Sequence, residues 1–116
     1  MKPGLNDIIE RIKVFRDERD WMQFHNHKDM AISIVIEAAE LLEHFQWQTE
    51  EEIDQHVKEN KDKISEEIAD IGIYLIELAD NLGVNLVDAM HKKLDKNAKK
   101  YPVDKAKGRH DKYDQL

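Results

Sequence analysis

The stretch from Met30 to Leu42 is apolar on nearly every face of the helix that its spacing predicts, and only Glu37 and Glu40 interrupt it. We predict one helix over residues 29–48, at the centre of a helical bundle, because a helix that is apolar all round must be covered on every side. A chain of 116 residues supplies few other helices for this cover. The sequence therefore predicts a bundle that is completed by oligomerisation.

A second long helix is predicted over residues 61–81, where apolar residues recur at helical spacing around Glu67 and Asp70. An amphipathic helix over residues 7–19 precedes both long helices, and another follows them and ends before Pro102. The composition agrees, since 41% of the residues are apolar, 37% are charged, and only two are proline and four are glycine. We expect an all-α fold.

Capping residues mark the breaks between these helices. Thr49, with Glu52 three positions later, resembles a capping box that opens a short acidic helix, and a polar connector is expected near Asn60. Gly83 suits the left-handed residue that follows a helix, and Asn85 suits the N-cap of the next one.

The C-terminal part of the chain differs from the rest in charge. The net charge is −7, but residues 88–116 carry nine Lys and Arg against five Asp, which leaves −11 on the first 87 residues. An acidic body argues against binding to nucleic-acid polymers, because that affinity depends on neutralising many phosphates. The basic part can still hold one short polyphosphate. We expect residues 1–102 to form one domain and residues 103–116 a polar, loosely ordered tail, unless a partner or ligand holds it.

The chain contains no cysteine, which excludes disulfides and thiolate chemistry. The N-terminal residues lack the apolar core of a signal peptide, and no segment reaches the about 18 apolar residues of a membrane span. We therefore expect a soluble, cytoplasmic protein without a membrane partner.

Two pairs of acidic residues are the strongest candidates for chemistry: Glu37 with Glu40, and Glu67 with Asp70. Residues three apart lie on neighbouring turns of one helix face, so antiparallel packing of the two long helices would gather all these carboxylates. Ionised carboxylates close together in a partly apolar setting are unfavourable unless they are protonated, paired with bases or bound to cations. Oxygen ligands favour Mg²⁺ or Mn²⁺, and magnesium usually shares its coordination with substrate phosphates.

The same acids can instead have an ordinary structural role. Acids at helical spacing are usually a solvated face, and Lys63 can be a salt-bridge partner of the second pair. However, the apolar neighbours of Glu37 leave no wide polar face. Ser33 and His44 lie on the side of an ideal helix that carries Glu37 and Glu40. A ferritin-like di-metal protein is disfavoured because no Glu has a His three positions later. A non-catalytic helical metal-binding or interaction module remains an alternative.

Four segments of this chain occur in a recognisable order. The run ERDWMQFH at residues 18–25 is followed by EAAELLEHFQW, then EEIADIGIYL, then KLDKNAKKYP. These segments resemble the MazG-like family, and within it the dCTP pyrophosphatases most closely. The resemblance covers about residues 5–113 and implies a bundle with two long metal-binding helices. The family signature E-x-x-E…E-x-x-D is matched by Glu37, Glu40, Glu67 and Asp70.

The resemblance implies a magnesium-dependent nucleoside triphosphate pyrophosphohydrolase. Such an enzyme cleaves (deoxy)nucleoside triphosphates, including dCTP, between the α and β phosphorus atoms, releases a monophosphate and pyrophosphate, and so cleans the nucleotide pool. The matched carboxylates would hold the metal, and either Glu37 or Glu40 would accept the proton of the attacking water. The resemblance also implies a homotetramer arranged as a dimer of dimers.

The resemblance further implies substrate-binding residues outside the acidic pairs. Lys93 and Asn97 form a polar stripe on the last helix, which can be a solvated face but matches the K-x-D-x-N motif of the family and so implies contact with phosphate. Ile12 stands where dCTP pyrophosphatases offer a histidine, so we expect loose preference among bases. The residues implied to line the base pocket, each of which can also be ordinary core, are Trp21, His25, Trp47 and Tyr74.

Overall fold

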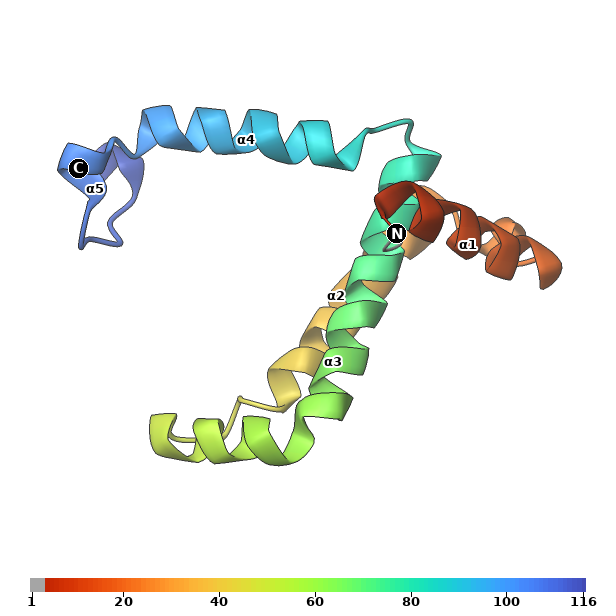
Figure 1. Cartoon of the computed structure of the whole chain (residues 1–116), viewed down its shortest axis with the longest axis horizontal. Coiled ribbons are helices and arrows are strands. Elements are labelled where there is room, and N and C mark those ends of the chain that lie inside the picture. The colour runs from red at the N-terminus through yellow and green to blue at the C-terminus, as the bar shows by residue number, and fades with distance from the viewer. Residues whose placement is uncertain (1–3) are drawn as a thin grey trace. The chain divides into compact units, whose positions relative to one another are not determined.

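The computed structural model describes residues 4–116, and within this range every regular element is a helix (Figure 1). The predicted all-α fold is confirmed. Across these residues, none of the helices has both the length and the apolar character that a membrane span needs. The elements in chain order are α1 (Leu5–Glu18), the 3₁₀ helix η1 (Met22–Phe24), α2 (His27–Glu43), α3 (Glu50–Asn81), α4 (Leu86–Lys100), α5 (Val103–Ala106) and the 3₁₀ helix η2 (Tyr113–Gln115).

The chain divides into two compact units, and each is described by itself. The first ends at Gly83, and the second runs from Val84 to Leu116. The predicted division into residues 1–102 and residues 103–116 stays a prediction.

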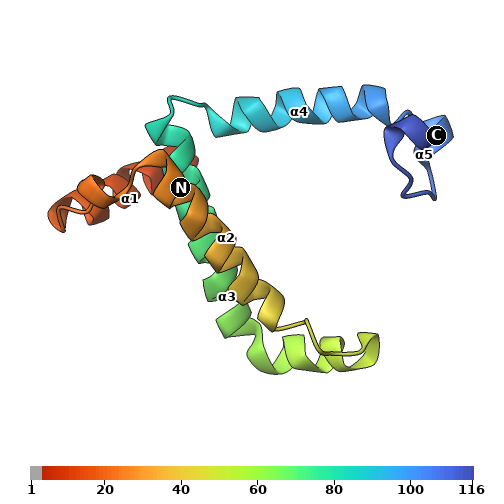
Figure 2. The ribbon, with the colours of Figure 1, turned by 180° about the vertical axis from the view of Figure 1, so that it is seen from behind.

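Helices α2 and α3 of the first unit lie side by side and run antiparallel (Figures 1 and 2). The start of α2 lies beside the C-terminal half of α3, since His25 just before α2 contacts Glu77. The end of α2 lies beside the middle of α3, since His44 just after α2 contacts Glu67. The two predicted acidic pairs therefore stand on neighbouring antiparallel helices.

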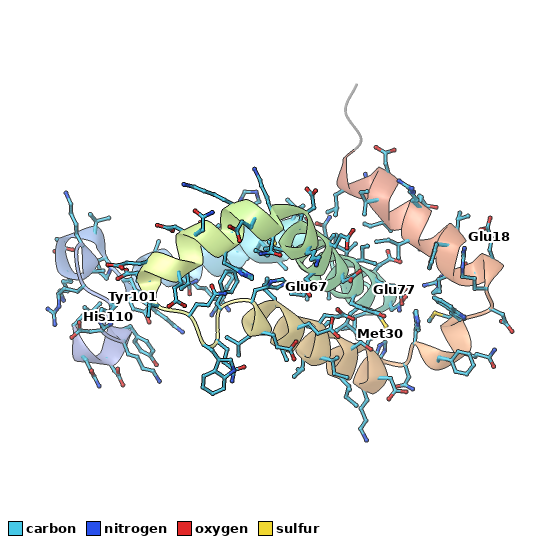
Figure 3. The ribbon with its side chains drawn as sticks, turned by 90° about the horizontal axis from the view of Figure 1, so that it is seen from below. Glu18, Met30, Glu67, Glu77, Tyr101 and His110 are labelled. Carbon is cyan, nitrogen blue, oxygen red and sulfur yellow. The ribbon has the colours of Figure 1, made fainter. Side chains whose placement is uncertain are left out.

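The apolar core of this unit is small. Met30 is only 1% exposed and Ile64 only 8%, and Figure 3 shows Met30 and Glu67 where α2 and α3 meet. By contrast, Val35 on α2 is 68% exposed and Ile68 on α3 is 55% exposed. The described part of a single chain thus leaves much of the apolar surface of both helices uncovered, which favours the self-association expected from the sequence.

Helix α1 packs against the C-terminal half of α3. The ammonium group of Lys13 lies 3.4 Å from the carboxylate of Asp80, and the guanidinium of Arg16 donates to the side-chain oxygen of Asn81 at 3.3 Å. Helix α1 begins at Leu5, two residues before the predicted start, and ends within one residue of the predicted end.

The helix predicted over residues 29–48 is too long at its C-terminal end, because α2 stops at Glu43. The backbone N–H groups of His44 and Phe45 donate to carbonyl oxygens three residues back, at 3.2 and 2.9 Å. Such bonds tighten the last turn and end a helix. His44 and Trp47 therefore belong to the connector that leads into α3.

The break predicted near Asn60 is confirmed, because α3 consists of two helical segments that meet at a kink there. The backbone of Asn60 is non-helical (φ −123°, ψ 22°), and its side-chain amide donates to the carbonyl oxygen of His56 at 3.0 Å. A side chain that enters the backbone hydrogen-bond ladder bends a helix in this way. The predicted N-cap is confirmed, since Oγ1 of Thr49 accepts the N–H of Glu52 at 3.3 Å. Gly83 has the predicted left-handed conformation (φ +70°).

The second unit contains α4, α5 and η2. Asn85 caps α4 as predicted, and the helix ends just before Tyr101. The rings of Tyr101 and Tyr113 meet edge to face with centroids 6.3 Å apart, and the ammonium of Lys100 lies 4.9 Å from the centroid of Tyr113. Residues 103–116 therefore fold back on the end of α4, although their composition indicated no fixed structure.

Candidate active site

The two predicted acidic pairs lie on α2 and α3. Glu37, Glu40 and Glu67 are half-buried, and Asp70 is exposed. Burial raises the pKa of Glu37, and contact with Glu40 raises it further. The negative charges of Asp70 and Glu67 act in the same direction. The carboxylates of the two helices are therefore close enough to oppose one another's ionisation, as expected of residues that share a cation.

Two carboxylate oxygens of this group are buried without a well-directed hydrogen-bond donor, Oε2 of Glu37 and Oε2 of Glu67. Such an oxygen is unfavourable unless a proton or a cation compensates it. These residues therefore fit a hard cation with oxygen ligands. Within residues 4–116, no three acidic or histidine side chains already form a ready-made metal site, so cation binding would require some of these side chains to rotate.

His44 touches the second acidic pair. Its Nε2 lies 2.6 Å from Oε2 of Glu67, although this oxygen has no well-directed hydrogen-bond donor. The two atoms are within ion-pair distance, although a hydrogen bond weakens steeply when its angle departs from linear. Glu67 therefore contacts His44 and still has room for a further partner on that oxygen.

A cavity of about 440 Å³ lies between α1, the connector that follows it and α3. Ile12, Phe15 and Ile73 form part of its apolar wall. Asp70, from the second acidic pair, also lines it. The cavity is thus contiguous with the acidic cluster, and its volume lies in the range of about 300 to 1,000 Å³ that is usual for small-molecule sites.

Three of the predicted pocket residues, Trp21, His25 and Tyr74, line this cavity together. The ring of Trp21 stands edge to face against Phe15, with centroids 5.7 Å apart. Burial raises the pKa of Tyr74, and the negative charge of Glu37 raises it further. The hydroxyl of Tyr74 therefore stays protonated at neutral pH and can donate a hydrogen bond.

The other three predicted substrate residues lie elsewhere in the chain. Trp47 lies on the connector between α2 and α3, where it is 86% exposed, and it is not among the described residues that line the cavity. Lys93 and Asn97 belong to α4 of the second unit, where Lys93 is exposed and Asn97 half-buried.

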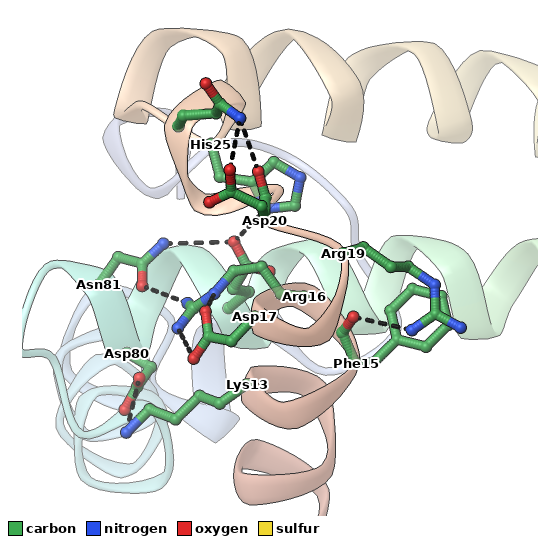
Figure 4. A network of polar contacts seen from close by, with 11 residues as sticks. Lys13, Phe15, Arg16, Asp17, Arg19, Asp20, His25, Asp80 and Asn81 are labelled. Carbon is green, nitrogen blue, oxygen red and sulfur yellow. Dashed lines mark hydrogen bonds and ion pairs between the residues drawn. The ribbon is translucent and has the colours of Figure 1, made fainter.

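A polar network that was not predicted from the sequence holds His25 (Figure 4). Nδ1 of His25 lies 2.7 Å from Oε2 of Glu77, and the amide of Asn81 donates to the same oxygen at 3.3 Å. Arg16, only 8% exposed, donates to Asn81 and to Asp17. The hydrogen bond to Asp17 raises the pKa of Arg16, so a permanent positive charge stands at the cavity wall.

A weak signal for this network is present in the sequence. Arg16 stands four positions after Ile12, and Glu77 stands four positions after Ile73. Both charged residues thus occupy positions on apolar stripes, where a charge needs a partner.

Comparison with known proteins agrees with these features. A model of the MazG-like family matches residues 32–116. Similar proteins include the dCTP pyrophosphatase 1 of Bos taurus, 38% identical over 117 residues, and that of Homo sapiens, 36% identical over 117 residues. Each match covers 99% of this chain and 69% of the relative. A crystal structure of a pyrophosphatase from Archaeoglobus fulgidus is 39% identical and superimposes with a TM-score of 0.83, over 88% of this chain and 95% of that one.

Proposed function

This chain belongs to the MazG-like family, and we propose that it is a nucleoside triphosphate pyrophosphohydrolase. Its substrates are (deoxy)nucleoside triphosphates, dCTP among them, and its products are the monophosphate and pyrophosphate. The names of the relatives, dCTP pyrophosphatase and pyrophosphatase, support this reaction. The role that follows is removal of unwanted nucleotides from the cellular pool.

The acidic cluster is the proposed metal site. The buried oxygens of Glu37 and Glu67 that lack well-directed donors support this assignment. Bound magnesium supplies charge neutralisation and polarisation of the phosphoryl group. Either Glu37 or Glu40 accepts the proton of the attacking water. The proposed ligands of Mg²⁺, which Mn²⁺ can replace, are Glu37, Glu40, Glu67 and Asp70.

The cavity beside the acidic cluster is the proposed site of the nucleoside. Its volume of about 440 Å³ and its apolar wall suit a base and a sugar. Trp21 offers a ring face for stacking, an interaction of about 1 to 3 kcal/mol per base. Tyr74 supplies a protonated hydroxyl, and His25 supplies an imidazole whose orientation is set by Glu77. A nucleoside in this cavity would direct its triphosphate toward Asp70.

The motifs shared with the family support the remaining substrate contacts. Lys93 and Asn97 stand one helical turn apart on α4, so a single phosphate can contact both. Trp47, being 86% exposed, offers a further ring for stacking.

We propose a homotetramer, a dimer of dimers, that acts in the cytoplasm and binds neither nucleic-acid polymers nor membranes. The exposed apolar residues of α2 and α3, such as Val35 and Ile68, support self-association. The net charge of −7 opposes binding to polyanions.

The observation that carries the proposed function is the position of Asp70, which is shared by the cavity and the acidic cluster. The test is a panel of the common ribo- and deoxyribonucleoside triphosphates with Mg²⁺, read by pyrophosphate release. We expect dCTP to be hydrolysed and a metal chelator to stop the reaction. If no triphosphate released pyrophosphate, while Mg²⁺ with a non-hydrolysable nucleotide still raised the melting temperature, the chain would be a binding module instead.

A further inference from the structure

A series of polar contacts leads from the kink of α3 to Glu67. Nδ2 of Asn60 lies 3.2 Å from Nδ1 of His56. Nε2 of His56 lies 2.9 Å from Nδ1 of His44, and Nε2 of His44 lies 2.6 Å from Oε2 of Glu67. The series thus connects two separate turns of α3 through the connector that follows α2.

The proton positions in this series follow from its first member. The side-chain nitrogen of Asn60 also donates to the carbonyl oxygen of His56 at 3.0 Å, and an amide nitrogen is a donor only. Nδ1 of His56 therefore accepts, and a neutral His56 carries its proton on Nε2. That proton is donated to Nδ1 of His44, so a neutral His44 also carries its proton on Nε2. The series ends with an N–H beside the carboxylate of Glu67.

Packing keeps these groups in place. The side chains of His44 and Glu67 are 15% and 25% exposed. The rings of His44 and His56 lie with centroids 5.2 Å apart, and Phe45 packs edge to face on His56 at 6.5 Å. Oε2 of Glu67 contacts His44 but has no well-directed donor, so it remains able to take a further partner.

We propose that His44 is a positioning residue for the hydrolase reaction. Its Nε2 holds the carboxylate of Glu67 in the orientation needed by the metal site, and His56 holds His44 in turn. This inference rests on the proposed function, in which Glu67 is a metal ligand. Partners that orient a ligating side chain typically contribute about 10- to 100-fold to metal affinity.

Two substitutions of His44 separate its two nitrogens. The amide nitrogen of Gln is as many bonds from Cα as the donor Nε2 of His, and the amide oxygen of Asn is as many bonds away as the acceptor Nδ1. His44→Gln therefore keeps a donor for Glu67, whereas His44→Asn keeps only the contact with His56. The readout is the dissociation constant for Mn²⁺ of the whole protein without nucleotide, measured by electron paramagnetic resonance, with pyrophosphate release measured in parallel.

We expect His44→Asn to weaken Mn²⁺ binding by about tenfold or more, and His44→Gln to stay within about threefold of the unsubstituted protein. Equal affinity of His44→Asn and the unsubstituted protein would overturn the inference, and so would equal losses in both variants. An unsubstituted protein that neither binds Mn²⁺ nor releases pyrophosphate would overturn the proposed function, and this inference with it.

His56→Asn provides a second test that leaves His44 in the chain, which matters if His44→Asn fails to fold. It removes the group that orients His44, so we expect it to weaken Mn²⁺ binding relative to the unsubstituted protein, by less than His44→Asn where that variant folds, and unchanged affinity would overturn the inference. In the His44→Asn background, His56→Asn should cause no further loss, since both residues act on Glu67 along one path. Independent, additive losses would show that His56 does not act through His44 and would overturn the proposed arrangement.

Discussion

Nδ1 of His25 lies 2.7 Å from Oε2 of Glu77, whose residue is only 4% exposed. The contact joins the connector after α1 to the C-terminal half of α3. Arg16 of α1 joins the same carboxylate through Asn81. The positions of α1 and of the connector at the cavity wall therefore depend on the buried carboxylate of Glu77.

We expect Glu77→Ala to lower the free energy of unfolding by about 1 to 3 kcal/mol, the cost of leaving buried polar groups unpaired. Glu77→Gln should cost less, because its amide oxygen can still accept from His25. Urea unfolding measures both changes. The control is Glu18→Ala, since the side chain of Glu18 is 67% exposed and its contact with Arg19 is 3.8 Å long. Equal stability of Glu77→Ala and this control would contradict a structural role for the network.

The four acidic residues of the cluster should be required together for activity. Changing any one of them to its amide should leave the fold intact and reduce turnover by about a hundredfold or more, because each contributes to one shared charge site. The measurement is pyrophosphate release, with circular dichroism to confirm folding. Glu66→Gln is the matched control, since Glu66 is exposed and adjacent to Glu67 on α3. Substantial activity in two or more of the cluster variants would exclude this metal site.

The raised pKa of Glu37 predicts a pH-dependent stability. The folded state binds the proton of Glu37 more tightly than the unfolded state does. Proton binding at Glu37 therefore contributes fully to the free energy of unfolding below the ordinary pKa of 4.5, and this contribution is lost as the pH rises through the higher pKa of the folded state. The side chain of Gln in Glu37→Gln does not ionise, so this variant lacks the unfavourable negative charge at high pH. In the presence of a chelator, we expect Glu37→Gln to melt at a higher temperature than the unsubstituted protein at about pH 8, with the gap closing toward about pH 4. A gap that does not change with pH would contradict this origin.

The products distinguish a pyrophosphohydrolase from an ordinary phosphatase. Attack of water on the α phosphorus forms a new bond from the solvent oxygen to that phosphorus and breaks its bond to the bridging oxygen, so the solvent oxygen appears in the monophosphate and pyrophosphate leaves unlabelled. We expect dCTP to yield dCMP and pyrophosphate, with no dCDP accumulating. Mass spectrometry of products formed in isotopically labelled water gives the answer, and labelled orthophosphate together with dCDP would replace the proposed reaction.

Base preference should be loose. Ile12 lines the cavity and supplies apolar area without a hydrogen bond, and apolar contacts discriminate by only about 1 to 3 kcal/mol between similar ligands. We expect dCTP to be preferred over other deoxynucleotides by about a hundredfold or less, and Ile12→His to change that ratio. Catalytic efficiencies for dCTP, dTTP, dUTP, dATP and dGTP test both points. A ten-thousandfold preference that Ile12→His left unchanged would place the discriminating contacts elsewhere.

Much of the fold could be predicted from the sequence, because its signals are local. The periodic apolar residues of α1 and the caps at Thr49 and Asn85 depend only on neighbours a few positions away. The break at Asn60 was predicted, but its form as a kink and not a loop was not, since a helical pattern does not show whether an amide will bond to its own backbone or to water. The predicted end of α2 was late because residues 44–47 are compatible with a helix and leave it only in the folded context.

Part of the candidate site could be predicted because its residues stand in motifs that resemble a known family, and not because of local helix signals. Trp21 and Tyr74 stand in recognisable motifs, and the structure brings both to one cavity. Arg16 and Glu77 were missed because charged residues on a helix usually face water, and only the packing of α1 on α3 shows them buried together. Trp47 is far more exposed in the single chain than an ordinary pocket residue.

The apolar surface that α2 and α3 leave uncovered has a consequence for how much of this protein a cell must make. Val35 and Ile68 remain more than half exposed in the described part of one chain. If further copies cover them, part of the stability comes from association and depends on protein concentration. Dilution then favours dissociated and unfolded chains. Total activity therefore rises more steeply than linearly with the concentration of chains. In that case a modest change in synthesis would change the rate of triphosphate hydrolysis by a larger factor.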